Sequence, residues 1–154
     1  MDGGNHATVE QVVFEGCTPI FRVRSLPASI EYYLHALGFK LDWQHADFFA
    51  SVSRGRFHLF LSQGDQGNPG GWVWVGVSDV EALHAEYRAS GAKIRHPPTN
   101  YQWAYEMQVE DLDGNVLRLG SEPKQNTPVG EWLDMNGVRW ILSPEQEWHR
   151  ADHQ

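Results

Sequence analysis

The feature that most constrains the fold of this chain is an order of strand and helix signals that occurs twice. In the first copy, residues 19–24 alternate as a strand does, and Ser25-Leu-Pro27 then favours the start of a helix. Apolar residues follow at helical spacing as far as Gly38, which is typical of a helix end. Three strands are predicted after this helix, at residues 39–43, 48–53 and 56–62.

The same order of signals returns at residue 72. A strand is predicted at 72–77, a helix at 80–90, and further strands near 93–94, 105–110 and 115–119. Val77 follows Val23 by 54 residues, and Gly91 follows Gly38 by 53. The sequence therefore predicts an α+β fold with two β-α-β-β-β units, at 18–62 and 72–121. We expect them to form curved antiparallel sheets around a shared cleft.

Two segments lie outside this repeated plan. Residues 1–17 are expected to form an N-terminal arm, which could be exchanged between subunits. Residues 122–154 form a C-terminal extension, interpreted either as strand, turn and strand or as one irregular cover, with a frayed or helical charged end. Trp132, Trp140 and Trp148 recur in it every eight residues, so an apolar tail could cover the cleft.

Composition excludes several classes of function. The net charge of −8 disfavours nucleic acid, which needs a basic surface. No apolar run is long enough to span a membrane, and the first residues lack the hydrophobic core of an export signal, so we expect a cytoplasmic protein. Seven Trp residues are more informative, because Trp is frequent in sites that hold flat apolar ligands.

Short motifs within the two units resemble those of the glyoxalase / bleomycin-resistance / extradiol-dioxygenase (vicinal oxygen chelate) superfamily. Leu37-Gly-Phe39 closes the first predicted helix, and Asp111-Leu-Asp-Gly-Asn115 lies in the last predicted hairpin. Three stretches resemble the bleomycin-resistance proteins in particular: Asp47–Ser62, Gly71–Val75 and Tyr101–Trp103. The resemblance covers about residues 19–121. It implies a glyoxalase-like fold and a homodimer whose ligand crevices lie between two subunits.

The resemblance also raises the question of a metal, because enzymes of this superfamily place His or Glu at four positions on the first and last strands of the units. The matching positions here are Thr18, a residue within Leu59–Leu61, Trp72 and Arg118. None is a usual metal ligand, and an Arg would repel a cation. The sequence therefore predicts no metal site and no cofactor.

Candidate ligand-binding residues are implied by the same resemblance. Phe49 and Trp103 match the aromatic rings between which a planar ligand is held, although Phe49 could equally belong to the core. Trp72 and Trp74 alternate with valines, so both rings share one side of a strand and could contact either the ligand or a subunit interface.

Polar residues near these rings complete the predicted site. Ser62, at the end of its strand, could donate a hydrogen bond at the mouth of the crevice. Asp47 and Glu106, with Asp42 and Glu110, could supply negative charge for a cationic ligand, or could simply be solvated.

We therefore expect a binding protein rather than an enzyme. The predicted function is metal-independent binding and sequestration of a planar, cationic antibiotic of the bleomycin type, which would give antibiotic resistance. One alternative is a metal-independent lyase or isomerase acting on a small aromatic or carbonyl metabolite, with Glu106 as the general base. Another is a structural or regulatory relative that has no small ligand.

Overall fold

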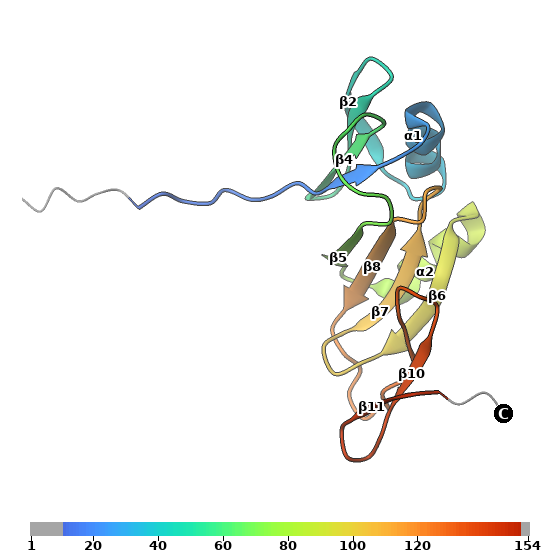
Figure 1. Cartoon of the computed structure of the whole chain (residues 1–154). Coiled ribbons are helices and arrows are strands. Elements are labelled where there is room, and N and C mark those ends of the chain that lie inside the picture. Colours follow the sequence, from blue (N-terminus) through green and yellow to red (C-terminus); the bar gives the residue numbers. More distant parts are fainter. Residues whose placement is uncertain (1–10, 152–154) are drawn as a thin grey trace, which may run out of the picture.

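The computed structural model describes residues 11–151, and both predicted units are present in it (Figure 1). Unit 1 contains β1 (Ile20–Arg22), α1 (Leu26–His35), β2 (Lys40–His45), β3 (Phe49–Arg54) and β4 (Phe57–Ser62). Unit 2 contains β5 (Trp72–Gly76), α2 (Val80–Ser90), β6 (Lys93–Asn100), β7 (Tyr105–Glu110) and β8 (Val116–Ser121). The predicted α+β class with two β-α-β-β-β units is therefore confirmed. Most of the predicted N-terminal arm lies outside the described residues.

Each unit builds one four-stranded sheet, in the order β1-β4-β3-β2 or β5-β8-β7-β6. The first strand of each unit pairs in parallel with the last, and the other pairs are antiparallel, so the sheets are mixed rather than purely antiparallel as predicted. The reason is topological. A helix returns the chain so that the second strand runs in the same direction as the first, and two hairpins then make the fourth strand parallel to both.

Local signals in the sequence explain where the helices begin and end. The Ser25 hydroxyl accepts a hydrogen bond from the Ala28 amide, 3.3 Å away, and Asp79 caps α2 in the same way through the Ala82 amide, 3.0 Å away. Gly91 ends α2 with a φ of 81°, a left-handed conformation that is costly for residues with a side chain.

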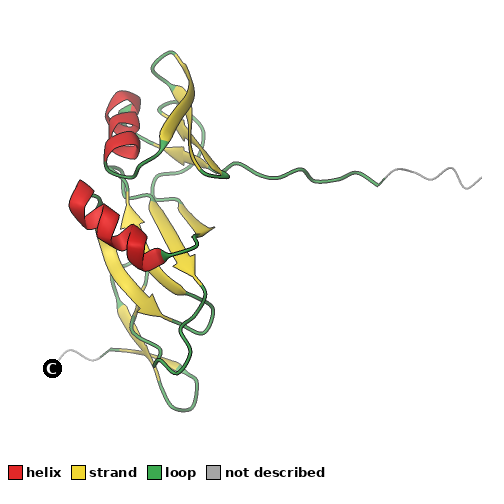
Figure 2. Ribbon diagram, turned by 180° about the vertical axis from the view of Figure 1, so that it is seen from behind, coloured by secondary structure: helices red, strands yellow, loops and turns green. Residues whose placement is uncertain are grey.

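Both helices lie on the same side of the two sheets (Figure 2). One core joins the units there, with buried side chains from α1, α2 and the strands β1, β3, β4, β7 and β8. The Tyr33 hydroxyl donates to Asp111 Oδ2 of unit 2 at 3.0 Å, and the Tyr87 hydroxyl donates to the Leu37 carbonyl of unit 1 at 2.7 Å. Each sheet therefore has one face in the shared core and one face turned away from the helices. We call the second the helix-free face.

The C-terminal extension forms a third, antiparallel sheet of β9 (Trp132–Leu133), β10 (Arg139–Leu142) and β11 (Trp148–Arg150), here called the C-terminal sheet. The eight-residue spacing places one Trp in each strand. Trp140 is paired with Trp132, and Leu142 with Trp148, so the three indoles lie on one face. Residues 148–150 are a strand, not the short helix considered for the charged end.

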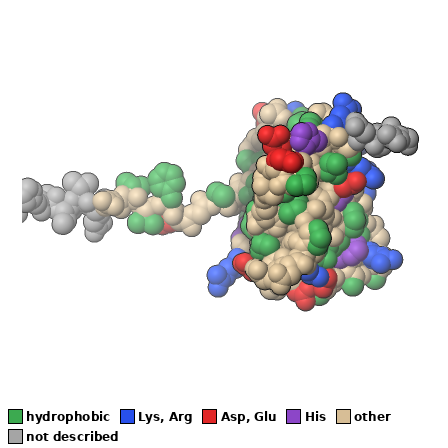
Figure 3. Space-filling view, turned by 90° about the horizontal axis from the view of Figure 1, so that it is seen from below, with side chains coloured by type: hydrophobic (Ala, Val, Ile, Leu, Met, Phe, Trp, Pro, Cys, Tyr) green, Lys and Arg blue, Asp and Glu red, His purple; other side chains and the backbone are tan. Residues whose placement is uncertain are grey.

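Residues 11–19 project from the body as an extended segment (Figure 1). Hydrophobic side chains lie along it (Figure 3), including Val12, Val13 and Phe14, of which Phe14 is 94% exposed. Within residues 11–151, neither helix is long and apolar enough to cross a membrane.

Candidate functional site

Three aromatic rings form a cluster on the helix-free face of unit 1. Ala50 and Val52 of β3 point into the core, so strand alternation turns Phe49 to the opposite face. There its ring lies 5.8 Å from that of Trp43, nearly parallel at 25°, and 5.3 Å from that of Phe60. Trp43 is 45% exposed. This unit 1 cluster is therefore an open apolar surface with a flat ring at its edge.

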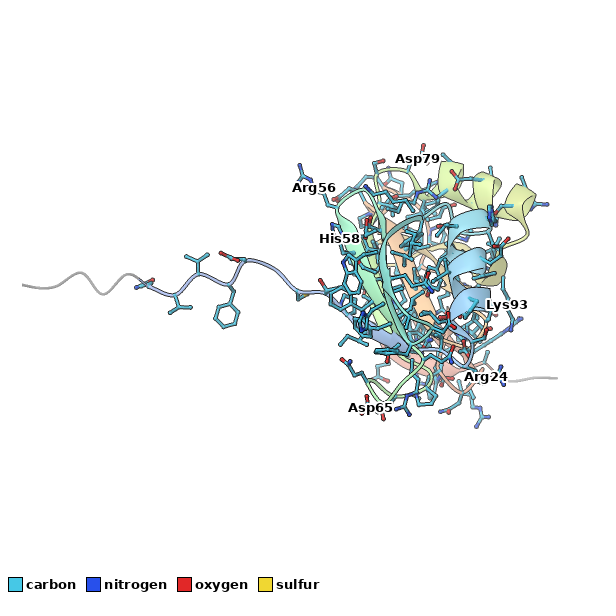
Figure 4. All side chains as sticks on the ribbon, turned by 90° about the horizontal axis from the view of Figure 1, so that it is seen from above. Arg24, Arg56, His58, Asp65, Asp79 and Lys93 are labelled. Carbon is cyan, nitrogen blue, oxygen red and sulfur yellow. The ribbon has the colours of Figure 1, made fainter. Side chains whose placement is uncertain are left out.

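Polar groups lie beside the cluster on the same face. The Asp42 carboxylate accepts hydrogen bonds from the hydroxyls of Ser53, at 2.7 Å, and Ser51, at 3.0 Å. His58 Nδ1 lies 3.4 Å from the same carboxylate, and His58 projects from β4 on the side away from α1 (Figure 4). The Ser53 hydroxyl, followed by Ser51 and His58, lowers the pKa of Asp42.

The helix-free face of unit 2 carries a buried ion pair instead of exposed rings. Glu106 lies between core residues of β7 and is 1% exposed. Arg118 of the neighbouring β8 holds it with two parallel hydrogen bonds, Nε to Oε2 at 2.9 Å and Nη2 to Oε1 at 3.0 Å. Trp103 Nε1 also donates to Glu106 Oε1. The carboxylate is therefore fully engaged by groups of its own chain.

Trp132 of the C-terminal sheet lies over this ion pair. The Arg118 guanidinium is 4.8 Å from the centre of the Trp132 ring, a cation–π distance. The rings of Tyr101 and Trp103 meet Trp132 edge-on, at 5.6 and 5.9 Å and at 77° in both cases. Trp72 lies 6.4 Å away on another side. The indole is thus surrounded by one cation and three aromatic rings.

The backbone around Trp132 is also bound to unit 2. Gln108 Nε2 donates to the Leu133 carbonyl at 2.9 Å, and Arg95 donates to the carbonyls of Leu133 and Asp134. The Tyr101 hydroxyl donates to the Glu131 carbonyl at 2.5 Å. These contacts hold the start of the C-terminal sheet on the helix-free face of unit 2.

Phe49 and Trp103, the two rings of the predicted clamp, belong to separate clusters in one chain. Phe49 packs with Trp43 and Phe60, whereas Trp103 packs with its own loop and the C-terminal sheet. Trp103 stacks on Tyr101 at 4.8 Å and 4°, so one of its faces is already covered, and the residue is 43% exposed.

The other predicted ligand-binding residues are spread over both units. Trp72 is half-buried between Trp132 and the Arg95 guanidinium, which is 5.2 Å from its ring. Trp74 is 48% exposed and its ring lies beside Gly120, where a Cβ would meet the ring at 3.0 Å. Ser62 is buried at the end of β4, opposite Phe49, and Asp47 is exposed in the turn before β3.

Sequence reasoning overlooked several residues that define these surfaces: Trp43, Phe60, Arg95 and Gln108. For Gln108 a signal existed, because it alternates with Met107 and Val109 in the same way as Glu106 does. The eight-residue spacing of Trp132, Trp140 and Trp148 indicated a tail that could cover the cleft, but the partners of Trp132 were not predicted, because they are distant in the sequence.

The positions at which this superfamily binds a metal do not fit a cation here. Arg118 is paired with Glu106, and Trp72 lies under Arg95, so guanidinium groups stand where ligand atoms would be needed. Among residues 11–151, no group of three or more His, Cys, Asp and Glu side chains is placed to hold a metal ion.

This fold and these motifs belong to a known family. The family model of the Glyoxalase/Bleomycin resistance protein/Dioxygenase superfamily matches residues 8–119, so the chain belongs to that superfamily. The resemblance drawn from the sequence motifs is therefore confirmed. No curated protein matches the chain.

Solved structures agree with this assignment. The bleomycin-binding protein of Streptomyces verticillus, solved with copper(II)-bleomycin, is 25% identical, with a TM-score of 0.62 over 71% of this chain and 98% of that one. TioX from Micromonospora sp. ML1 is 18% identical, with a TM-score of 0.60 over 73% and 99% of the two chains. Lactoylglutathione lyase from Agrobacterium tumefaciens is 17% identical, with a TM-score of 0.57 over 70% and 94%. The last two show the fold alone. The superfamily thus includes both binding proteins and enzymes.

Proposed function

We propose that the protein binds a planar, cationic antibiotic of the bleomycin type without a metal ion, and so sequesters it. The observation that carries the proposal is the unit 1 cluster, in which Trp43, Phe49 and Phe60 offer an open aromatic surface. A flat ring stacked on such a surface gains about 0.5–1.5 kcal/mol beyond the burial of its area. The net charge of −8 favours a cationic ligand, and the similar protein from Streptomyces verticillus was solved with copper(II)-bleomycin.

We further propose that two copies form the crevice together. An exposed aromatic face is a costly surface for a monomer. In the proposed homodimer, unit 1 of one copy faces unit 2 of the other, which brings Phe49 toward Trp103 of the partner subunit. Sedimentation at micromolar concentration should then give twice the chain mass of 17.5 kDa, and a particle of 17.5 kDa would contradict the pairing.

The state of Glu106 favours binding over the alternative of metal-independent catalysis. Both of its oxygens accept hydrogen bonds from Arg118, and one also accepts from Trp103. A general base needs a free oxygen within reach of the substrate proton, which this arrangement does not offer.

The proposed function is tested by isothermal titration calorimetry, in which metal-free bleomycin is titrated into the full chain in the presence of EDTA. We expect saturable binding, which Phe49→Ala should weaken by roughly 1–3 kcal/mol, as truncation of a stacking residue does. Phe48→Ala is the matched control, because Phe48 is 48% exposed in the adjoining turn and contacts His45 rather than the cluster. An absence of saturable binding, or equal effects of the two substitutions, would refute the assignment.

A further inference from the structure

The C-terminal sheet holds an aromatic ring where unit 2 would receive a ligand. We propose that the helix-free face of unit 2 is a subsite for a planar aromatic group bearing carbonyl or carboxylate oxygens, and that Trp132 occupies it as a removable cover. The inference rests on the proposed function, because both place a ligand on the helix-free faces. It adds which chemical group the face of unit 2 accepts and how Trp132 controls access to that face.

The surroundings of Trp132 define the ring that the subsite accepts. Arg118 lies over the indole at 4.8 Å, which favours an electron-rich ring. Tyr101 and Trp103 meet the ring edge-on at 77°, the arrangement that aromatic pairs prefer to a face-to-face sandwich. Because these three groups belong to unit 2, they form a box that can hold one flat ring, either the ring of Trp132 or that of a ligand.

Hydrogen-bond donors beside the box define the oxygens. Gln108 Nε2 binds the Leu133 carbonyl at 2.9 Å, and Gln108 is only 1% exposed. Arg95, whose side chain is 11% exposed, donates to the carbonyls of Leu133 and Asp134. Two buried donors left without acceptors would be costly. A ligand that replaces the cover must therefore bring acceptor oxygens next to its ring.

The cover is held much less firmly than the surface beneath it. Every residue from 122 to 151 keeps some exposure, whereas Tyr101, Glu106 and Gln108 below are each 1% exposed. The cover contains no helix, and it lies beyond residue 119, where the family model ends. A segment with few buried side chains opens at a lower free energy than the core to which it is attached.

The first experiment uses N-acetyl-L-tryptophanamide, which has an indole ring flanked by two amide carbonyls, as Trp132 has in the chain. We expect full-length Trp132→Ala to bind this probe at least about tenfold more tightly than the unchanged chain, because the vacated box is preformed. Ile141→Ala is the control, since Ile141 lies on the opposite face of the C-terminal sheet and is 45% exposed. A Trp132→Ala chain that keeps its near-ultraviolet circular dichroism but binds no more tightly would overturn the inference.

The second experiment closes the cover covalently and does not depend on Trp132→Ala folding. A Cβ built on Gly130 would lie 3.8 Å from Thr99 Cβ, within the separation of about 3.5–4.5 Å that a disulfide needs. The single cysteine of the chain, Cys17, is first replaced by serine so that it cannot interfere. The variant that then carries Thr99→Cys and Gly130→Cys should bind both the tryptophan amide and metal-free bleomycin at least about tenfold more weakly when oxidised than when reduced. The reduced form of the same chain is the control.

The two probes separate the possible failures. Equal affinity of the oxidised and reduced forms for both probes would contradict the proposal that the C-terminal sheet covers the subsite. Bleomycin binding to neither form would refute the proposed function alone, while the tryptophan amide would still decide whether the subsite and its cover exist.

Discussion

Unit 1 and unit 2 share one order of strands and one pairing pattern, yet their helix-free faces differ in chemistry and in cover. Unit 1 leaves a cluster of three aromatic rings partly exposed, with its carboxylate among hydroxyl groups at the side. Unit 2 places a carboxylate and a guanidinium at the centre of its sheet and lays an indole over them. The repeated order of elements therefore determines the backbone arrangement of both units, but it does not determine which side chains lie on their helix-free faces.

The difference has a physical basis in the cost of burying charge. An ion pair taken out of water is tolerated only when its geometry is good and its remaining donors and acceptors are satisfied. The pair of Glu106 and Arg118 has such a geometry under the Trp132 ring: its two hydrogen bonds are parallel, and both carboxylate oxygens accept one. In unit 1 the apolar rings need no such partners, so that face can remain open until a ligand or a second copy covers it.

The largest effect should come from breaking the buried pair in unit 2. Glu106→Ala leaves Arg118, whose side chain is 26% exposed, without its partner, which should lower the free energy of unfolding by about 3–5 kcal/mol. Asp42→Ala makes the same change beside the open face of unit 1, where only hydroxyls and His58 lose a partner, and should cost about 1 kcal/mol. Urea denaturation at neutral pH measures both.

A second substitution distinguishes lost pairing from lost packing. Adding Arg118→Met to Glu106→Ala removes the unpaired charge and should recover much of the stability. If the double variant is as unstable as Glu106→Ala alone, the cost of burying charge does not explain the difference between the two helix-free faces.

A smaller effect should appear in the opening of the cover. Amide hydrogens of β10 and β11 should exchange through local opening at a free energy at least about 2 kcal/mol below that of β7 and β8. The core strand β3 of unit 1 is the internal reference, since Ala50 and Val52 are fully buried. Exchange of β10 at the same rate as β7 would mean that the C-terminal sheet is an integral part of unit 2.

The repeated units could be predicted from the sequence because their signals are local. The stripe from Val80 to Ser90, with Gly91 after it, predicts a helix that the structure shows with the same bounds. The sequence left Phe49 open between the core and the ligand site, and the structure turns it away from the core. The parallel pairing of β1 with β4 was missed, although the order of elements in each unit requires it.

The site could be predicted only in part, because its decisive contacts join distant segments. The eight-residue period of Trp132, Trp140 and Trp148 indicated a tail that could cover the cleft, but it did not indicate that Trp132 lies over Arg118, because the connection between them has no regular structure. Glu106 was predicted only as a charge for the ligand, a solvated residue or a general base, because the guanidinium that neutralises it comes from the next strand. Candidate residues follow from residue type and alternation, whereas their partners follow from the tertiary fold.

The smallest effect concerns the pH dependence of unit 1. Hydrogen bonds from Ser53, and then from Ser51 and His58, lower the pKa of Asp42 in the folded state. A lowered pKa means that the ionised carboxylate stabilises the fold above the pKa of the unfolded chain, near pH 4, and that this contribution disappears as the pH falls through the folded value. Asp42→Asn should therefore be less stable than the unchanged chain at neutral pH, and the difference should vanish in acid. Asp47→Asn is the matched control, because Asp47 is exposed in the adjoining turn. Thermal melts of both variants and of the unchanged chain from pH 7 to pH 3 make the measurement. If the melting temperature of Asp42→Asn stays below that of the unchanged chain by a constant amount across this range, the hydrogen bonds from the hydroxyl groups do not depend on the charge of residue 42.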